Sequence, residues 1–278
     1  MSLNQTKQGT ALWDKHRAKI YSKRGGWRIG KGVYNCGYDM MNDLVGEKSY
    51  MQVVVLNAVG RLPERKLANW LEAAFICLSW PDPRIWCNQI GALNGTMQAS
   101  VVSATVAGIL AADSRRYGSK PLIDGATFIQ NALVGNNKGL SVTKIISNEC
   151  AKYGGRPFIT GYARPIAKGD ERVEAMERVT KNLGFSIGSH LQLAYKIEAE
   201  LKEKFSEGMN INGYASAFLS DNGFSPMEIY QMCAIVVNSG VTACYMDAYD
   251  RPAGAFLPLQ CEDIDYQGKP ARGLSHRL

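Results

Sequence analysis

Apolar positions recur at helical spacing over most of this chain. In residues 65–80, RKLANWLEAAFICLSW, they fall at i, i+3, i+4, i+7, i+8 and i+11, which places them on one face of a helix. These positions are Leu67, Trp70, Leu71, Ala74, Phe75 and Leu78. Asp82 and Pro83 follow and end the predicted helix. The spacing predicts an amphipathic helix that buries one stripe of side chains.

Two neighbouring segments also favour helices. Residues 50–63, YMQVVVLNAVGRLP, predict a helix that Gly60 and Pro63 end, although the run of valines is also typical of a strand. Residues 89–112 are rich in alanine, glycine, serine and threonine. Because small side chains let helices approach closely, we expect a central helix there, packed on all sides.

The second half of the chain continues the helical pattern. Residues 170–184 place apolar side chains on one helical face, and residues 190–205 form a charged amphipathic segment. Residues 226–249 are long and mostly apolar, with Pro226 suited to a first helical turn. Strand signals occur only near residues 27–35. The predicted class is all-α with a few peripheral strands.

The composition limits the classes of protein to which this chain can belong. The chain has 278 residues, of which 46% are hydrophobic and 21% charged, so it can build a large core and is not globally disordered. No apolar run approaches the roughly 18 residues of a membrane span. The polar start lacks the apolar core of a secretory signal, so we expect a cytoplasmic protein. The seven cysteines include no CxxC pair, which favours neither a zinc site nor a disulfide framework.

The net charge of +7 raises the question of a nucleic-acid partner. Eight Lys and Arg residues lie between Lys7 and Lys31, against one acid, but no nucleic-acid recognition motif accompanies them. A basic segment that is solvated, or that attracts a phosphate-bearing metabolite, is favoured. Residues 25–31, GGWRIGK, match half of a phosphate-binding loop. Gly32 replaces the Ser or Thr that would hold magnesium, so a turn into a short strand is the preferred interpretation.

Groups that exchange protons near neutral pH are scarce. The three histidines, His16, His190 and His276, are too scattered for a Ser–His–Asp or Cys–His arrangement. Residues 161–169, GYARPIAKG, pack two glycines, a proline, an arginine and a lysine into one loop without a histidine, cysteine or serine. Such a loop is typical of ligand binding by backbone and cations, and a solvated basic loop is the alternative.

Five stretches in chain order carry a resemblance. They are residues 37–63, 120–128, 161–172, 210–224 and 250–258, or GYDMMNDLVGEKSYMQVVVLNAVGRLP, KPLIDGATF, GYARPIAKGDER, NINGYASAFLSDNGF and DRPAGAFLP. Together they resemble the citrate synthase and citryl-CoA lyase family. The resemblance implies an all-α homodimer with a large helical domain and an inserted smaller one. Its implied boundaries are 1–124 and 220–278 for the large domain and 125–219 for the small domain.

That family joins or splits a carbon–carbon bond between an acyl-CoA and an oxo acid. A carboxylate removes a proton from the thioester methyl, and two histidines stabilise the enol and polarise the carbonyl. By the resemblance these three positions fall on Asn212, Ile123 and Arg164. An amide, an aliphatic group and a permanent cation do not exchange protons near pH 7. Standard citrate synthase activity is therefore expected to be negligible.

More of the family's ligand-binding residues than of its catalytic residues have a counterpart in this sequence. The resemblance implies that Arg172 grips a substrate carboxylate and that Arg251 reaches the same site across the dimer. Lys168 corresponds to a basic residue near the CoA phosphate. A backbone cradle for the adenine is implied at Ile159, Thr160, Gly161, Tyr162 and Ala163.

Two hypotheses follow. The chain is an acyltransferase or lyase with altered chemistry, in which Asp124 is a displaced base and Arg164 polarises a carbonyl beside Asn212. Alternatively, it is a non-catalytic homologue that binds a CoA ester or a di- or tricarboxylic acid. Neither requires a metal or a tightly bound cofactor, since a coenzyme A thioester is the expected substrate or ligand. No membrane or nucleic-acid partner is expected.

Overall fold

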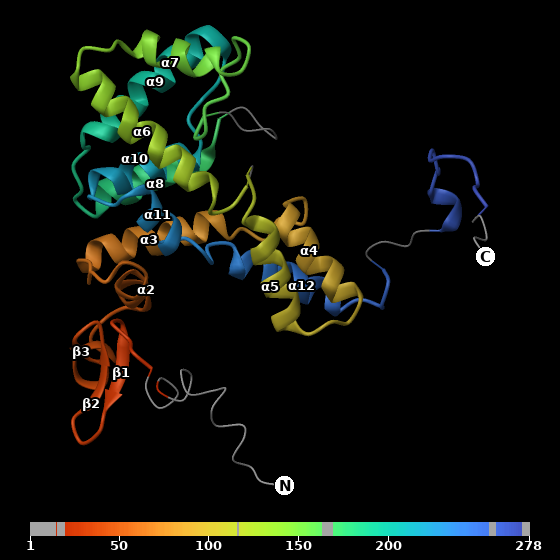
Figure 1. Ribbon diagram of the computed structural model, residues 1–278, viewed down its shortest axis with the longest axis horizontal. Helices are drawn as coiled ribbons and strands as arrows, with labels where there is room; N and C mark the ends of the chain where they lie inside the picture. The colour runs from red at the N-terminus through yellow and green to blue at the C-terminus, as the bar shows by residue number, and fades with distance from the viewer. Residues whose placement is uncertain (1–14, 16–19, 116, 163–168, 256–259, 274–278) are drawn as a thin grey trace. The chain divides into compact units, whose positions relative to one another are not determined.

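The computed structural model describes residues 15, 20–115, 117–162, 169–255 and 260–273. The chain forms two compact units, each described here by itself. Unit 1 contains Met1–Leu78 and Asp113–Val236, and unit 2 contains Ser79–Ala112 and Val237–Leu278. Helices dominate both units, as the periodicity predicts (Figure 1). The predicted domains 1–124, 125–219 and 220–278 have other boundaries and stay a prediction.

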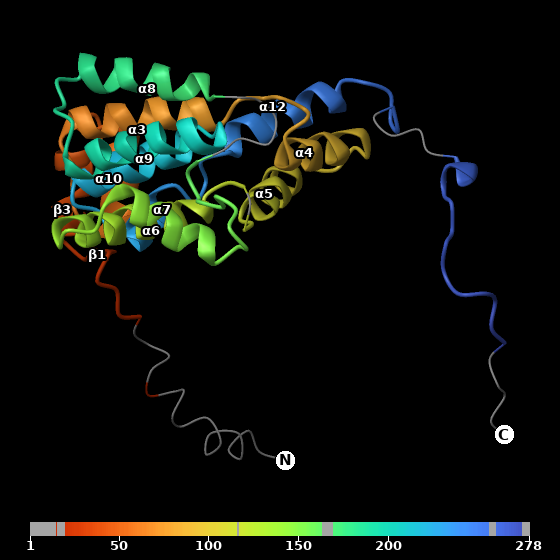
Figure 2. The same ribbon diagram turned by 90° about the horizontal axis from the view of Figure 1, so that it is seen from above.

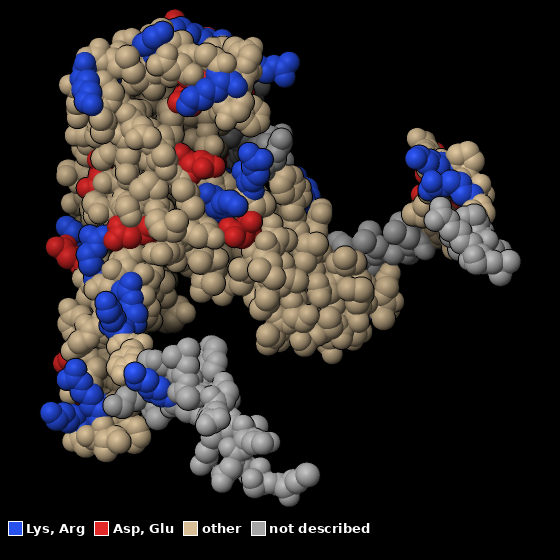
Figure 3. Space-filling view, viewed as in Figure 1, with Lys and Arg blue, Asp and Glu red and all other residues tan. Residues whose placement is uncertain are grey.

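A small antiparallel sheet begins unit 1. It contains β1 (Gly25–Arg28), β2 (Gly32–Asn35) and β3 (Tyr38–Asp39), and the short π-helix η1 (Met40–Leu44) follows. Residues 25–31 thus form a strand and a turn, which confirms the preferred interpretation of the GGWRIGK segment. Figure 3 shows Lys and Arg side chains over this sheet. One of them, Arg28, lies 5.1 Å from the ring centre of Tyr34.

The next two helices confirm the sequence predictions. Helix α2 spans Tyr50–Val59, and Ser49 and Gln52 cap its start reciprocally, which decides against a strand. It ends at Gly60, whose φ of +79° lies in the left-handed region that glycine adopts readily. Helix α3 spans Arg65–Leu78 and buries the first four predicted stripe residues, whereas Phe75 and Leu78 are half-buried.

Helix α10 (Ile211–Asp221) lies at the centre of unit 1. It packs against four other helices of the unit (Figures 1 and 2). They are α6 (Pro121–Asn137), α8 (Glu171–Asn182), α9 (Ser189–Phe205) and α11 (Pro226–Met232), and α7 (Val142–Ala151) packs on α6 and α9. Nearly every α10 residue is buried, so this helix organises the core.

A buried hydrogen-bond network ties α3, α8 and α10 together. The indole of Trp70 stacks on Phe218 with ring centres 4.0 Å apart. Its Nε1 donates to Oγ1 of Thr180 at 2.8 Å, and the Tyr214 hydroxyl donates to the same oxygen at 2.8 Å. Thr180 in turn donates to the carbonyl of Met176 at 2.7 Å. One threonine hydroxyl therefore satisfies two buried donors from two other helices.

Unit 2 contains three helices that approach closely. They are α4 (Trp86–Thr96), α5 (Val101–Ala112) and α12 (Asn238–Tyr249), and the short 3-10 helix η2 (Cys261–Asp263) lies near the C-terminus. Helix α12 packs on both α4 and α5. A Cβ added at Gly91 of α4 would lie 2.6 Å from the carbonyl oxygen of Val241. Glycine is needed there because no side chain fits between the two helices.

Two long helical segments predicted from composition are each broken in the structure. Residues 89–112 belong to α4 and α5, because the chain turns at residues 97–100, where Gln98 has a φ of +57°. The expectation of one helix packed on all sides is wrong, since α5 exposes a stripe of aliphatic side chains. The stripe consists of Val102, Val106 and Leu110. Residues 226–249 likewise divide into α11 and α12, with a turn between them.

We expect the hydroxyl of Thr180 to be essential to the core of unit 1. Thr180→Val keeps the side-chain volume but leaves the Trp70 and Tyr214 donors unpaired, which lowers the free energy of unfolding by about 2–4 kcal/mol. Urea denaturation of both proteins measures this difference. Thr180→Ser, which keeps the hydroxyl, is the control and loses clearly less. A Thr180→Val protein as stable as the wild type would contradict the assigned role.

Candidate functional site

The carboxylate of Asp170 joins the N-termini of α8 and α10. Its Oδ1 accepts hydrogen bonds from the backbone N–H of Arg172 at 3.2 Å and from Nε of Arg172 at 2.7 Å. Its Oδ2 accepts from Nη2 of Arg172 at 2.8 Å and from the backbone N–H of Ile211 at 2.9 Å. The Asp170 side chain is completely buried. Its charge is thus compensated by a two-pronged arginine contact that also fixes the start of α10.

The environment keeps this buried carboxyl ionised. Burial by itself would raise the pKa of Asp170, because the charged form loses its water. The Arg172 guanidinium and the backbone N–H groups of Arg172 and Ile211 outweigh burial and hold the pKa below its ordinary value of 3.8. Asp170 is therefore a fixed negative charge at neutral pH.

Arg172 is the residue that the resemblance assigns to a substrate carboxylate. Its side chain is 18% exposed. Nε and Nη2 bind Asp170, and Nη1 has no hydrogen bond to another described residue. The positive charge also acts on α3, because burial raises the pKa of the Cys77 thiol and Arg172 partly offsets that rise. Arg172 therefore has a structural partner already, and Nη1 is the guanidinium nitrogen that no described residue engages.

The backbone N–H groups at the start of α10 are all used within the protein. Asn210 caps the helix, and its Oδ1 accepts from the N–H groups of Asn212 at 2.9 Å and Gly213 at 3.2 Å. The N–H of Ile211 goes to Asp170. A helix N-terminus with free N–H groups attracts anions. Here that role must fall to side chains.

The side chain of Asn212 lies between α10 and α6. Its Oδ1 accepts a hydrogen bond from Oγ of Ser216, one helical turn later, at 3.3 Å. Gly125 of α6 closes this side, because a Cβ at that position would lie 2.8 Å from Oγ of Ser216. The contact needs glycine at position 125. Asn212 itself is half-buried.

Residues 159–162 run along the start of α10. The carbonyl of Gly161 accepts from the N–H of Asn210 at 2.9 Å, and Tyr162 pairs with Met209 in a short β-bridge. Gly161 has a φ of +100°, and a Cβ on it would lie 2.7 Å from Cα of Gly213. The two backbones therefore touch, which only glycine allows.

The side chains of the predicted adenine cradle are mostly in the core. Ile159 and Tyr162 are buried, and the Tyr162 hydroxyl donates to the carbonyl of Ala194 at 3.1 Å. Burial raises the pKa of this tyrosine. Only Thr160 is partly exposed among the four described members of the cradle. Any adenine contact there has to come from the backbone or from Thr160.

The structure brings several of the predicted residues into one place. We call Gly125, Gly161, Arg172, Asn212 and Ser216 the α10 corner. Asp124, the predicted displaced base, directly precedes Gly125 and is exposed, and Ile123 before it is half-buried. Three predicted residues lie outside the described part of the chain, and they are Ala163, Arg164 and Lys168.

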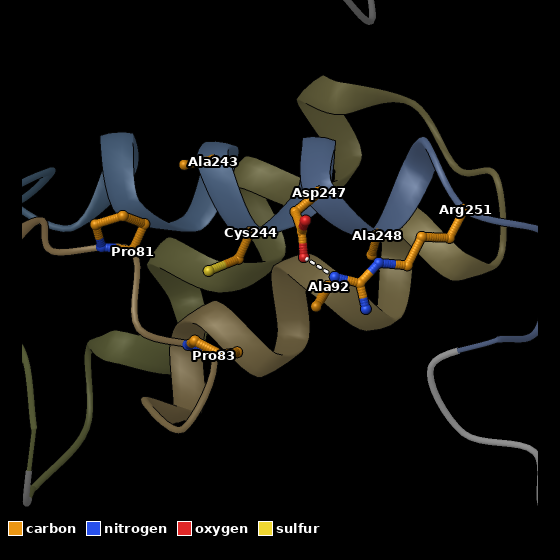
Figure 4. Close-up of a pocket in the computed structure, with 8 residues that line it drawn as sticks. All are labelled: Pro81, Pro83, Ala92, Ala243, Cys244, Asp247, Ala248 and Arg251. Atoms are coloured by element: carbon orange, nitrogen blue, oxygen red, sulfur yellow. Dashed lines mark hydrogen bonds and ion pairs between the residues drawn. The ribbon is translucent and has the colours of Figure 1, made fainter.

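Arg251 belongs to unit 2 and borders a pocket. It follows α12, and its Nη2 forms an ion pair with Oδ2 of Asp247 at 2.6 Å (Figure 4). The pocket has a volume of about 440 Å³. Its remaining lining residues are small or apolar, namely Pro81, Pro83, Ala92, Ala243, Cys244 and Ala248. A carboxylate ligand at Arg251 would have to displace Asp247 or share the guanidinium with it.

Other classes of site find no support among the residues described. In that part of the chain no group of His, Cys, Asp and Glu could hold a metal ion, and no helix is long and apolar enough to cross a membrane. His190 lies at the start of α9, where Asp221 accepts hydrogen bonds from its backbone N–H and contacts its ring. His16 and His276 lie outside the described residues.

Comparison with known proteins gives a match only at the level of structure. No protein-family model and no curated protein sequence matches this chain. Citryl-CoA lyase from Hydrogenobacter thermophilus matches with a TM-score of 0.76 and 23% identity, over 92% of this chain and 97% of that protein. Citrate synthase from Thermoplasma acidophilum, solved with carboxymethyl coenzyme A and oxaloacetate, matches with a TM-score of 0.59 and 14% identity, over 81% of this chain and 58% of that protein. This chain has the citrate synthase-like fold.

A larger enzyme contains the same fold. ATP citrate lyase from Methanosaeta concilii, solved in complex with (3S)-citryl-CoA, matches 97% of this chain with a TM-score of 0.71 and 17% identity. This chain spans 45% of that protein. The citrate synthase-like fold therefore occurs here in a chain of about the length of the citryl-CoA lyase. The fold predicted from five short motifs is confirmed.

Two residues that build the α10 corner, Asp170 beside it and Ser216 within it, escape prediction from the sequence. Asp170 is recognisable only as an acid suited to a helix N-terminus, and its bond to Ile211 joins residues 41 positions apart. Ser216 lies in an apolar helix and resembles any buried small residue. The spacing Asp-x-Arg at residues 170–172 was a usable signal. The same spacing at Asp82 and Arg84 also gives a two-pronged ion pair, with Nε–Oδ1 at 3.0 Å and Nη2–Oδ2 at 2.6 Å.

Asp170 makes the free energy of unfolding depend on pH in the acidic range. Because its folded-state pKa is below 3.8, its contribution is fully present above that pH and is lost as the pH falls through the folded-state pKa. Asp170→Asn leaves Arg172 without its partner and is expected to lower the free energy of unfolding by about 3 kcal/mol at pH 7.

Urea denaturation between pH 7 and pH 2 measures this effect. The difference between Asp170→Asn and wild type should shrink once the pH drops below about 3.8, where the unfolded wild-type chain takes up the Asp170 proton, and it should be lost below the folded-state pKa. Glu174→Gln removes an exposed carboxylate from the same first turn of α8 and is the matched control. A difference independent of pH would contradict the assigned pKa.

Proposed function

We propose that this chain binds an acyl-CoA and a di- or tricarboxylic or oxo acid, with the acid held at the α10 corner. The observation that carries the proposal is Arg172, which Asp170 holds in place while Nη1 remains available. An arginine fixed in this way is pre-organised for a carboxylate oxygen. Asn212 supplies a second polar group, one residue after Ile211, whose backbone N–H binds the same Asp170.

The proposal separates binding from standard citrate synthase chemistry. Asn212 has an amide where the resemblance expects a carboxylate base, and Ile123 has no group that donates a hydrogen bond. Loss of one electrostatic stabiliser typically lowers the rate by about 10²–10³. We therefore propose a citrate synthase-like protein whose own citrate synthase activity is negligible. If the protein forms or cleaves a carbon–carbon bond by altered chemistry, we propose that Asp124 and Arg164 are the residues that do so.

The proposed acid site involves a second copy of the chain. We infer a homodimer in the cytoplasm in which Arg251 of one copy serves the acid site of the other, as the resemblance implies. The ion pair between Arg251 and Asp247 is exposed, so a ligand or a partner copy can compete for it at small expense. Lys168 and the backbone of residues 159–163 are the proposed coenzyme A contacts.

Calorimetric titration with CoA, acetyl-CoA and citrate tests the binding proposal. The wild type should bind acetyl-CoA and citrate, and ligand at 100 times its Kd should raise the free energy of unfolding by about 2.7 kcal/mol. Arg172→Lys keeps the positive charge but loses the planar guanidinium that can bind two oxygens at once, so citrate affinity should fall about tenfold or more. Arg178→Ala removes an exposed arginine of the same helix and should leave citrate affinity unchanged. Absence of binding by the wild type at millimolar ligand would overturn the proposal.

A second assay decides between the enzyme and its non-catalytic alternative. If Asp124 is the displaced base, Asp124→Asn abolishes turnover of CoA thioesters and leaves their affinity intact, because the residue is exposed and its amide keeps the shape. Turnover is followed as release of free CoA thiol in the presence of oxo acids. Equal turnover in both proteins would remove Asp124 from the mechanism. No turnover in the wild type, together with binding, would establish the non-catalytic alternative.

A further inference from the structure

The hydroxyl of Ser216 is buried and needs an acceptor for its proton. Ser216 is fully buried on α10, and its own backbone carbonyl accepts from Oγ of Ser220 at 2.7 Å. Its Oγ donates to Oδ1 of Asn212 at 3.3 Å. On the α6 side, Gly125 offers no side chain that could take the bond. The Asn212 amide oxygen is thus the acceptor that the Ser216 proton has among the described residues.

This bond decides which way round the Asn212 amide lies. The oxygen and nitrogen of a side-chain amide have nearly the same shape, so hydrogen-bond partners determine the orientation. With the amide reversed, Ser216 would face N–H donors and lose its bond to Oδ1 of Asn212. Its proton would then have to turn to the backbone carbonyl one helical turn earlier, as the proton of Ser220 does. Oδ1 therefore faces Ser216, and Nδ2 lies on the other side of the amide.

The donors on Nδ2 are available. Nδ2 of Asn212 has no hydrogen bond to another described residue, and the residue is half-buried rather than enclosed. Asp170 links Arg172 to Ile211, the residue before Asn212. The backbone N–H groups at the start of α10 are used internally, so the amide of Asn212 is the donor that this helix start offers.

We propose that Ser216 is a positioning residue that fixes Asn212 as a hydrogen-bond donor to a carbonyl or carboxylate oxygen of the ligand. This rests on the proposed function of the α10 corner. A carboxylate at position 212 would only accept hydrogen bonds, whereas the oriented amide donates them. The site therefore selects ligands that present an oxygen acceptor at this point, and a thioester carbonyl and an acid carboxylate share that chemistry.

The experiment combines calorimetry with the side-chain ¹⁵NH₂ resonances of Asn212, measured on the full chain. The probes are citrate, acetyl-CoA and CoA. Binding of the selected ligand should shift the Asn212 NH₂ signal downfield. A shift with citrate assigns a carboxylate, and a shift with acetyl-CoA but not with CoA assigns the thioester carbonyl.

Three variants test the role of Ser216. Ser216→Ala frees the amide to rotate, so the affinity for the ligand that shifts Asn212 should fall about three- to tenfold. Ser220→Ala removes another buried hydroxyl of α10, one turn further on, and should leave that affinity unchanged. Asn212→Asp replaces the donor with a negative charge of the same shape, so citrate affinity should fall by about tenfold or more.

The outcomes separate this inference from the proposed function. Wild-type binding with an unmoved Asn212 signal, or with equal affinity in Ser216→Ala and Asn212→Asp, overturns the inference and leaves the proposed function standing. Failure of the wild type to bind any of the three probes overturns the proposed function and the inference with it. A thermal melt of each variant checks that it is folded before titration.

Discussion

The buried carboxylate of Asp170 is the interaction on which the candidate site depends. It takes hydrogen bonds from Arg172 and from the first residue of α10, so two helix starts and one cation are held by a single side chain. Without it, Arg172 would have no fixed orientation, and the start of α10 would lose its link to α8. The carboxylate stays charged because its partners outweigh its burial. The position of Arg172 and the charge balance at the start of α10 thus depend on one buried side chain.

The remainder of unit 1 keeps α10 rigid. The network around Thr180 ties α3 and α8 to the middle of α10, and Gly125 and Gly161 let α6 and residues 159–162 reach its first turn. In both features, packed helices rather than flexible loops hold the polar groups at the start of α10 in position. A site supported in this way is pre-organised, because the helices that carry it cannot shift separately. This is consistent with binding by fixed donors rather than by closure of side chains around a ligand.

Much of the fold follows from sequence because helical periodicity is strong where one face is buried. The stripe of α3 and the cap of α2 are examples, and both lie within single segments. The break between α4 and α5 is hard to predict because the residue that adopts the positive φ is Gln98 rather than a glycine. For the site, the resemblance placed Gly161, Arg172 and Asn212 in motifs, and the structure brings them to one corner. The Asp-x-Arg spacing indicates the pair of Asp170 and Arg172, but the bond from Asp170 to Ile211 could not be predicted, since these residues become neighbours only after folding.

The contact between Asn212, Gly125 and Ser216 also bears on how such proteins diverge. An amide and a carboxylate have the same shape, so either fits the space that Gly125 leaves beside α10. In the genetic code, asparagine and aspartate codons differ by one nucleotide. A lineage with this corner can therefore exchange a base for a donor in one mutational step, with no repacking and no poorly folded intermediate. Gly161 is the part of the corner that tolerates no side chain, because its positive φ and its contact with the Gly213 backbone leave no room for one.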